Sequence, residues 1–145
     1  MKKQITSAFS LIELTLAIGI AAVCLLAVFG LVPVAVLTTR NATSQTAATN
    51  IMAAVIADLR ATSKSINTSK QFAITFGASK TLYFDDTGQF STSLGTNSRY
   101  QVGIRWFPSG SIPLRYADVT VTWPAAATAA NATGSTEMFA AFDRN

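Results

Sequence analysis

A single carboxylate, that of Glu13, lies near the beginning of an apolar stretch that runs to Leu37. On insertion scales a carboxylate at the centre of a membrane helix costs about 2.5–3.5 kcal/mol, so an acid in such a segment is expected to have a function and a partner. The chemistry open to it is ion pairing, because an ammonium group is attracted far more strongly in a low-dielectric surrounding than at a wet surface. Glu13 is therefore the leading candidate for a functional residue.

Few other residues could do chemistry. The chain has no His and a single Cys, Cys24, which lies in the same apolar stretch. This composition excludes a Cys–His nucleophile, a Cys/His zinc site and an intrachain disulfide. Asp85 and Asp86, followed by Thr87 and Gly88, predict a β-turn rather than a calcium loop, because calcium takes about six to eight oxygen ligands. We therefore predict a protein that is not an enzyme and that uses no cofactor and no metal.

The apolar stretch predicts a membrane-spanning helix. Residues 14–37 carry no charge, and at about 1.5 Å per residue they form about 36 Å of helix, enough to cross a hydrocarbon core of about 30 Å. A secretory signal fits poorly, because its uncharged segment is usually only about 7–15 residues long. Lys2 and Lys3 before the stretch and Arg40 after it predict a cytoplasmic N-terminus and an exported domain. Pro33 predicts a kink or local melting near residues 29–33.

The rest of the chain predicts an α+β domain with a long helix and a small antiparallel sheet. Apolar residues recur at steps of three and four and predict that the helix continues to about residue 62 with one buried face: Ala48, Ile51, Met52, Val55, Ile56 and Leu59. The period then changes to two, which indicates four or five strands within about 71–142, at 72–76, 81–84, 100–107, 119–123 and 136–142. Residues 124–135 predict a loop. Trp106, Phe107 and Trp123 are expected to pack in the sheet rather than to form a stacking platform for sugars or bases.

The residues around Glu13 resemble a known processing motif. A basic leader with Lys2 and Lys3 is followed by the small residue Ala8 and by Phe9-Ser-Leu-Ile-Glu13. This run is similar to the prepilin-type cleavage and methylation segment of type IV pilins and type II secretion pseudopilins, in which a small residue precedes Phe-Thr-Leu-Ile-Glu. The short domain and the last strand are more similar to the minor, I-type or PilV-like pseudopilins than to a major subunit.

The resemblance implies a pathway for the protein. Prepilin peptidase would cut between Ala8 and Phe9, remove the leader 1–8 and methylate the new amine of Phe9. Ala8 stands where the family has Gly, so slower cutting is expected. Residues 9–37 would then form the transmembrane and assembly helix, in which Glu13 faces the Phe9 ammonium of a neighbouring subunit, and residues 38–145 the pilin-like globular domain.

Two functions follow from these observations. The first is a structural subunit, in particular a minor one, of a type IV pilus or type II secretion pseudopilus. Its partners would be other pilins or pseudopilins, the assembly platform of the bacterial inner membrane and membrane lipid. The alternative is a single-span membrane-anchored binding module that never polymerises, in which Glu13 lies at the headgroup level without a partner. Nucleic acid is not an expected partner, because Lys and Arg are scattered singly along the chain.

Overall fold

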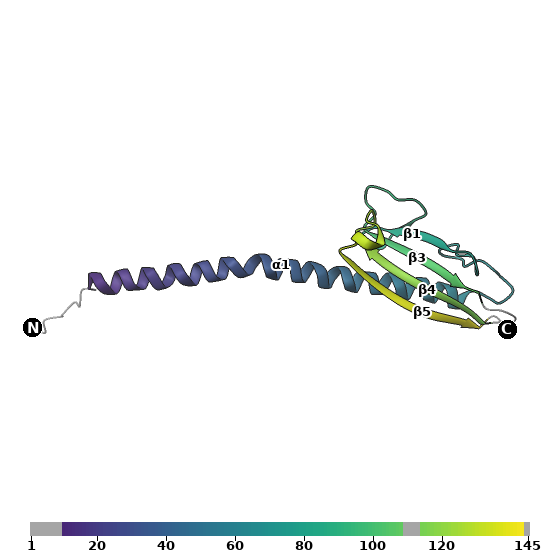
Figure 1. Cartoon of the computed structure of the whole chain (residues 1–145), viewed down its shortest axis with the longest axis horizontal. Coiled ribbons are helices and arrows are strands. Elements are labelled where there is room, and N and C mark those ends of the chain that lie inside the picture. Colours follow the sequence, from purple (N-terminus) through teal and green to yellow (C-terminus); the bar gives the residue numbers. More distant parts are fainter. Residues whose placement is uncertain (1–9, 109–113, 144–145) are drawn as a thin grey trace, which may run out of the picture. The chain divides into compact units, whose positions relative to one another are not determined.

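A computed structural model describes residues 10–108 and 114–143 of the chain. It confirms the α+β class: one helix and five antiparallel strands, in sheet order β2-β1-β3-β4-β5 (Figure 1). The elements are α1 (Leu11–Ala61), β1 (Lys80–Phe84), β2 (Phe90–Ser91), β3 (Tyr100–Phe107), β4 (Leu114–Trp123), the 3-10 turn η1 (Ala129–Asn131) and β5 (Gly134–Asp143). The chain divides into two compact units with the boundary between Arg40 and Asn41.

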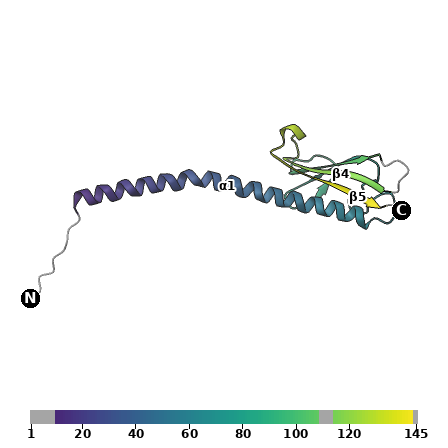
Figure 2. The ribbon, with the colours of Figure 1, turned by 60° about the horizontal axis from the view of Figure 1, so that its bottom comes forward.

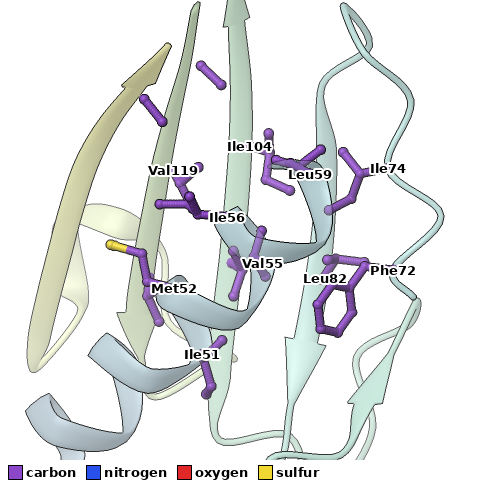
Figure 3. Close-up of a cluster of buried hydrophobic side chains, with 14 of the residues drawn as sticks. Ile51, Met52, Val55, Ile56, Leu59, Phe72, Ile74, Leu82, Ile104 and Val119 are labelled. Atoms are coloured by element: carbon purple, nitrogen blue, oxygen red, sulfur yellow. The ribbon is translucent and has the colours of Figure 1, made fainter. Parts of the chain in front are cut away.

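The C-terminal part of α1 forms the core together with one face of the sheet (Figure 2). All six helix residues of the predicted apolar face are buried, and Ser44 extends this face by one turn. Figure 3 shows Val55, Ile56 and Leu59 between side chains of the sheet, with Ile104 and Val119 among them. The helix ends at Ala61, where the Thr62 hydroxyl donates to the carbonyl oxygen of Asp58 at 2.8 Å. The predicted end at about residue 62 is confirmed.

Helix α1 continues through Pro33 without a break. The local melting predicted at residues 29–33 is therefore not found. Proline removes one amide donor from a helix, but its fixed φ of about −65° is compatible with helical backbone. In this chain the loss of that one hydrogen bond does not end the helix.

The sheet departs from the predicted strands in three places. Strand β4 begins at Leu114, five residues before the predicted start at 119, and the two-residue strand β2 was not predicted. Residues 72–76 do not form a strand, although the predicted alternation is real: Phe72, Ile74 and Phe76 are buried. The last strand, β5, is confirmed as an edge strand of ten residues.

The segment between α1 and β1 is held by side chains and by a short backbone pairing around the isolated bridge between Thr68 and Thr75, and not by a strand of the sheet. The two carboxylate oxygens of Asp58 accept the backbone N–H groups of Gln71 at 3.1 Å and Phe72 at 3.0 Å. The Lys80 ammonium donates to the carbonyl oxygens of Phe72 and Ala73. Ala73 has a φ of +49°, which no extended strand adopts. Tertiary contacts made by two charged residues therefore override the local β pattern.

Gly134 should be the glycine of the sheet that least tolerates a side chain. It pairs with Trp123, and a Cβ at this position would lie 2.2 Å from Cζ2 of the indole. We expect Gly134→Ala to lower the free energy of unfolding by about 1–3 kcal/mol, the usual cost of forcing extra atoms into a packed site. Urea unfolding of the detergent-solubilised chain, followed by tryptophan fluorescence, measures the change.

Gly103 provides the matched control for this substitution. It also lies within a strand, but a Cβ there would meet no atom within 4 Å. Gly103→Ala should leave stability unchanged or raise it by up to about 1 kcal/mol, because alanine restricts the unfolded chain. Equal losses for the two variants would show that the contact with Trp123 does not decide the cost.

Candidate functional site

The N-terminal part of α1 exposes its apolar side chains along its whole length. Leu11 is 80% exposed, and every large apolar side chain from there to Leu37 is also exposed. The most apolar window of the helix has a mean hydropathy of 2.8 and buries none of its residues within the chain. This part of α1 therefore does not belong to the core of the domain, and its length and composition are those of a membrane span or a signal sequence.

Glu13 has a structural role that the sequence analysis missed. Its Oε2 accepts the backbone N–H of Ser10 at 3.0 Å, and the N–H of Leu14 donates to the carbonyl oxygen of Ser10 at 3.2 Å. Ser10 is thus the N-cap, and Glu13 is the third helical residue, which reaches back to it as in a capping box. The Ser-x-x-Glu spacing was the signal that could have predicted this contact.

The position of Glu13 also suits its charge. The first turn of a helix carries a partial positive charge, so a carboxylate there stabilises the helix. The side chain is exposed and remains open to a further cation. Ala8 and Phe9, the predicted cleavage and methylation residues, lie outside the described residues, as do Lys2 and Lys3.

One side of the apolar helix is indented. A shallow groove of about 450 Å³ runs along Thr15, Leu16, Gly19, Ile20, Val23 and Cys24. The indentation is at Gly19, where no atom lies within 4 Å of the position of a Cβ. The Thr15 hydroxyl is satisfied within the helix by the carbonyl oxygen of Ile12 at 3.0 Å. This side offers van der Waals contact to lipid or to another helix, because small residues let two backbones approach closely.

The threonines that follow are also satisfied within the helix. The hydroxyls of Thr38 and Thr39 donate to the carbonyl oxygens of Val34 and Ala35, each at 2.9 Å. Thr46 and Thr49 do the same with carbonyl oxygens four residues before them. Such bonds satisfy the hydroxyl groups within the helix itself, so these threonines need no partner outside it.

The acidic β-turn is confirmed. Oδ1 of Asp85 accepts the Thr87 hydroxyl at 2.7 Å and the backbone N–H groups of Thr87 and Gln89, each at 2.9 Å. These donors, the Thr87 hydroxyl first, lower the pKa of Asp85 below its usual value. Gly88 has a φ of +84°, which favours glycine at this position. Within the part of the chain that the structure describes, no three Asp, Glu, Cys or His residues gather as metal ligands.

The predicted packing of the large aromatic residues is also confirmed. Trp106 and Trp123 are partly buried against the core. Phe107 lies on the opposite face of the sheet, 38% exposed, with its ring 5.6 Å from that of Phe139. None of these three residues stands alone as an exposed platform.

No family model matches this chain, and no curated protein and no solved structure matches it either. A long apolar N-terminal helix exposes its first half, and its second half packs on an antiparallel sheet. This is a pilin-like architecture.

Proposed function

We propose that this chain is a structural subunit, and in particular a minor one, of a type IV pilus or type II secretion pseudopilus. The observation that carries the proposal is that only the C-terminal part of helix α1 packs in the core. The hydrophobic core begins at Ala48, with Ser44 buried one turn before it, so the domain closes its core without the apolar half of α1. That half is therefore available to lipid and then to the helices of other subunits.

In this proposal the chain carries out no reaction of its own. Prepilin peptidase cuts between Ala8 and Phe9 at the cytoplasmic face of the bacterial inner membrane and methylates the new amine. The processed helix is then passed by the assembly platform from the bilayer into a bundle of like helices. There Glu13, in the first helical turn, compensates the Phe9 ammonium of a neighbouring subunit, and the low dielectric of the bundle strengthens this attraction.

Peptidase-dependent processing tests the proposal. The chain is expressed with an active prepilin peptidase, and separately with an inactive one, and its intact mass is measured. We expect loss of residues 1–8 and gain of one methyl group only with the active enzyme. An unchanged mass with the active enzyme would contradict the proposal and favour the membrane-anchored binding module.

Substitutions of Ala8 should change the rate of cleavage in both directions. Ala8→Gly should speed cleavage about two- to fivefold, because glycine removes the β-carbon and frees the backbone where the chain must enter the peptidase, an effect of about 0.5–1 kcal/mol. A time course of leader loss on a gel measures the rate. Ala8→Val is the matched variant in the other direction and should slow cleavage. Equal rates for all three chains would argue that the cut lies elsewhere.

The second candidate function is a membrane-anchored binding module that never assembles. It is favoured by the outer face of the sheet, which the core does not use and which carries polar side chains together with the exposed rings of Phe107 and Phe139. The two candidates differ in processing and in co-purification with pilins or pseudopilins, and the presence of a binding site on the domain is compatible with both.

A further inference from the structure

A shallow groove crosses the sheet on the face opposite α1. Four residues lie side by side across β1, β3, β4 and β5: Thr81, Gly103, Thr120 and Glu137. Their strand neighbours, among them Val102 and Val119, are in the core, so these four side chains point away from the helix. Gly103 leaves the middle of the row open, since a Cβ there would meet nothing within 4 Å. The result is a groove of about 480 Å³.

One wall of this groove contains a carboxylate, that of Asp118, in which one oxygen has no hydrogen-bond partner among the described residues. The side chain of Asp118 is 9% exposed, and its Oδ2 accepts a hydrogen bond from Nη2 of Arg105 at 3.0 Å. Its Oδ1 is buried and has no hydrogen-bond partner among the described residues. A buried charged oxygen without a donor is costly, and in native proteins it usually has a reason. A ligand that brings a donor would remove this cost.

The charges in the groove favour a cation. Glu137 is exposed and lies diagonally across the strand pair from Asp118, at a spacing of about 7–8 Å in an antiparallel ladder. Two cations also line the groove. Arg105 pairs with Asp118, and the Lys80 ammonium donates to the carbonyl oxygens of Phe72 and Ala73. Among the described residues, the Glu137 carboxylate therefore has no ion-pair partner within 4 Å.

We propose that this groove binds a lysine side chain of a partner polypeptide. The ammonium would lie between Oδ1 of Asp118 and the carboxylate of Glu137, with the Thr120 hydroxyl as a third acceptor. A guanidinium prefers both oxygens of one carboxylate, and Arg105 already occupies one oxygen of Asp118, so a compact ammonium with three donors fits better. Phe139, beside Asp118 and 61% exposed, offers an apolar surface for the carbon stem of lysine.

The Arg105 side chain must move before a ligand can reach Oδ1 of Asp118. Oδ1 of Asp118 is closed to water in the free chain, so a ligand reaches it only when the groove widens. The Arg105 side chain is 68% exposed and holds Asp118 through a single nitrogen, while its guanidinium lies over the Phe107 ring at 5.2 Å. A rotation of this exposed side chain is fast and changes no core contact.

The experiment is an NMR titration of the full chain, ¹⁵N-labelled and solubilised in detergent, with N-acetyl-lysine methylamide. Saturable shifts are expected at the amides of Thr81, Gly103, Thr120 and Glu137. The arginine analogue should bind at least about fivefold more weakly, and the norleucine analogue should cause no saturable shift. Glu137→Gln, which changes an exposed side chain, should raise the Kd about tenfold, equal to about 1.4 kcal/mol. Asp118→Asn should raise it at least as much.

Asp86→Asn is the matched control, because it removes one carboxylate in the acidic turn away from the groove. It should change the Kd by less than twofold. The inference is overturned if the norleucine analogue gives the same shifts, if arginine binds as well as lysine, or if Glu137→Gln binds like the unchanged chain. Because the groove uses no residue before Ser79, these outcomes are independent of leader processing and of assembly.

Discussion

Replacing Asp58 with alanine should lower the free energy of unfolding of the domain by about 2–4 kcal/mol. The Asp58 carboxylate accepts two backbone N–H groups, those of Gln71 and Phe72, from a segment more than ten residues further along the chain. A hydrogen bond to a charged group contributes about 1.5–3 kcal/mol, and a donor left without a partner costs the desolvation of that group. Phe72 is 2% exposed, so its N–H is poorly placed to find water instead.

The loss should spread beyond the two hydrogen bonds. Phe72 makes edge contacts with Phe84 and Phe90, with ring centroids 5.6 and 5.2 Å apart. Urea unfolding of the detergent-solubilised chain, followed by the fluorescence of Trp106 and Trp123, measures the change, since both tryptophans lie in the sheet.

Two further substitutions test whether the hydrogen bonds of the Asp58 carboxylate account for the loss of stability. Asp58→Asn keeps one side-chain acceptor and should cost about half as much as Asp58→Ala. Asp86→Ala removes an exposed acid in a turn and should change stability by less than about 0.5 kcal/mol, as is usual for surface substitutions. If Asp58→Ala and Asp86→Ala behaved alike, the two hydrogen bonds to Asp58 would contribute little to holding the segment before β1.

The helix was predictable because its signals are local. The apolar spacing from Ala48 to Leu59 identified the buried face, and the uncharged stretch from residue 14 to 37 identified the exposed half. Strands 81–84, 100–107 and 136–142 were found for the same reason, since alternation along one strand reports burial on one face. The local melting expected near Pro33 is not found, because local rules weigh a lost hydrogen bond but not the length of helix on either side of it.

What the sequence did not predict depends on partners far along the chain. Residues 72–76 have the alternation of a strand, but Asp58 and Lys80 hold their backbone and Ala73 has a positive φ. The groove depends on a register that places Gly103 beside Thr120 and Thr120 beside Glu137, and alternation in one strand cannot supply this pairing. The capping contact of Glu13 differs from these cases, because the four-residue motif Ser-x-x-Glu would have been enough to predict it.

The largest expected effect on assembly is that of Glu13. Glu13→Leu makes the apolar stretch continuous, so insertion should be as good as before or better, by the few kcal/mol that a carboxylate costs. In the proposed filament it leaves the Phe9 ammonium of the next subunit without its partner, which should cost about 3–5 kcal/mol if that pair is buried. We therefore expect normal insertion and processing together with a severe loss of co-purification with pilin or pseudopilin partners.

Glu13 also caps its own helix, and Glu13→Gln separates the two roles. Glutamine can still accept the Ser10 N–H from the third helical position, as in a capping box, but it carries no charge. If the charge acts in assembly, Glu13→Gln should be nearly as defective as Glu13→Leu in a pull-down of partners from detergent extracts. Assembly of Glu13→Gln at the level of the unchanged chain, with Glu13→Leu defective, would instead assign Glu13 to the helix cap. Normal assembly of both variants would contradict any role for this carboxylate in a filament, because neither chain could then compensate the neighbouring ammonium.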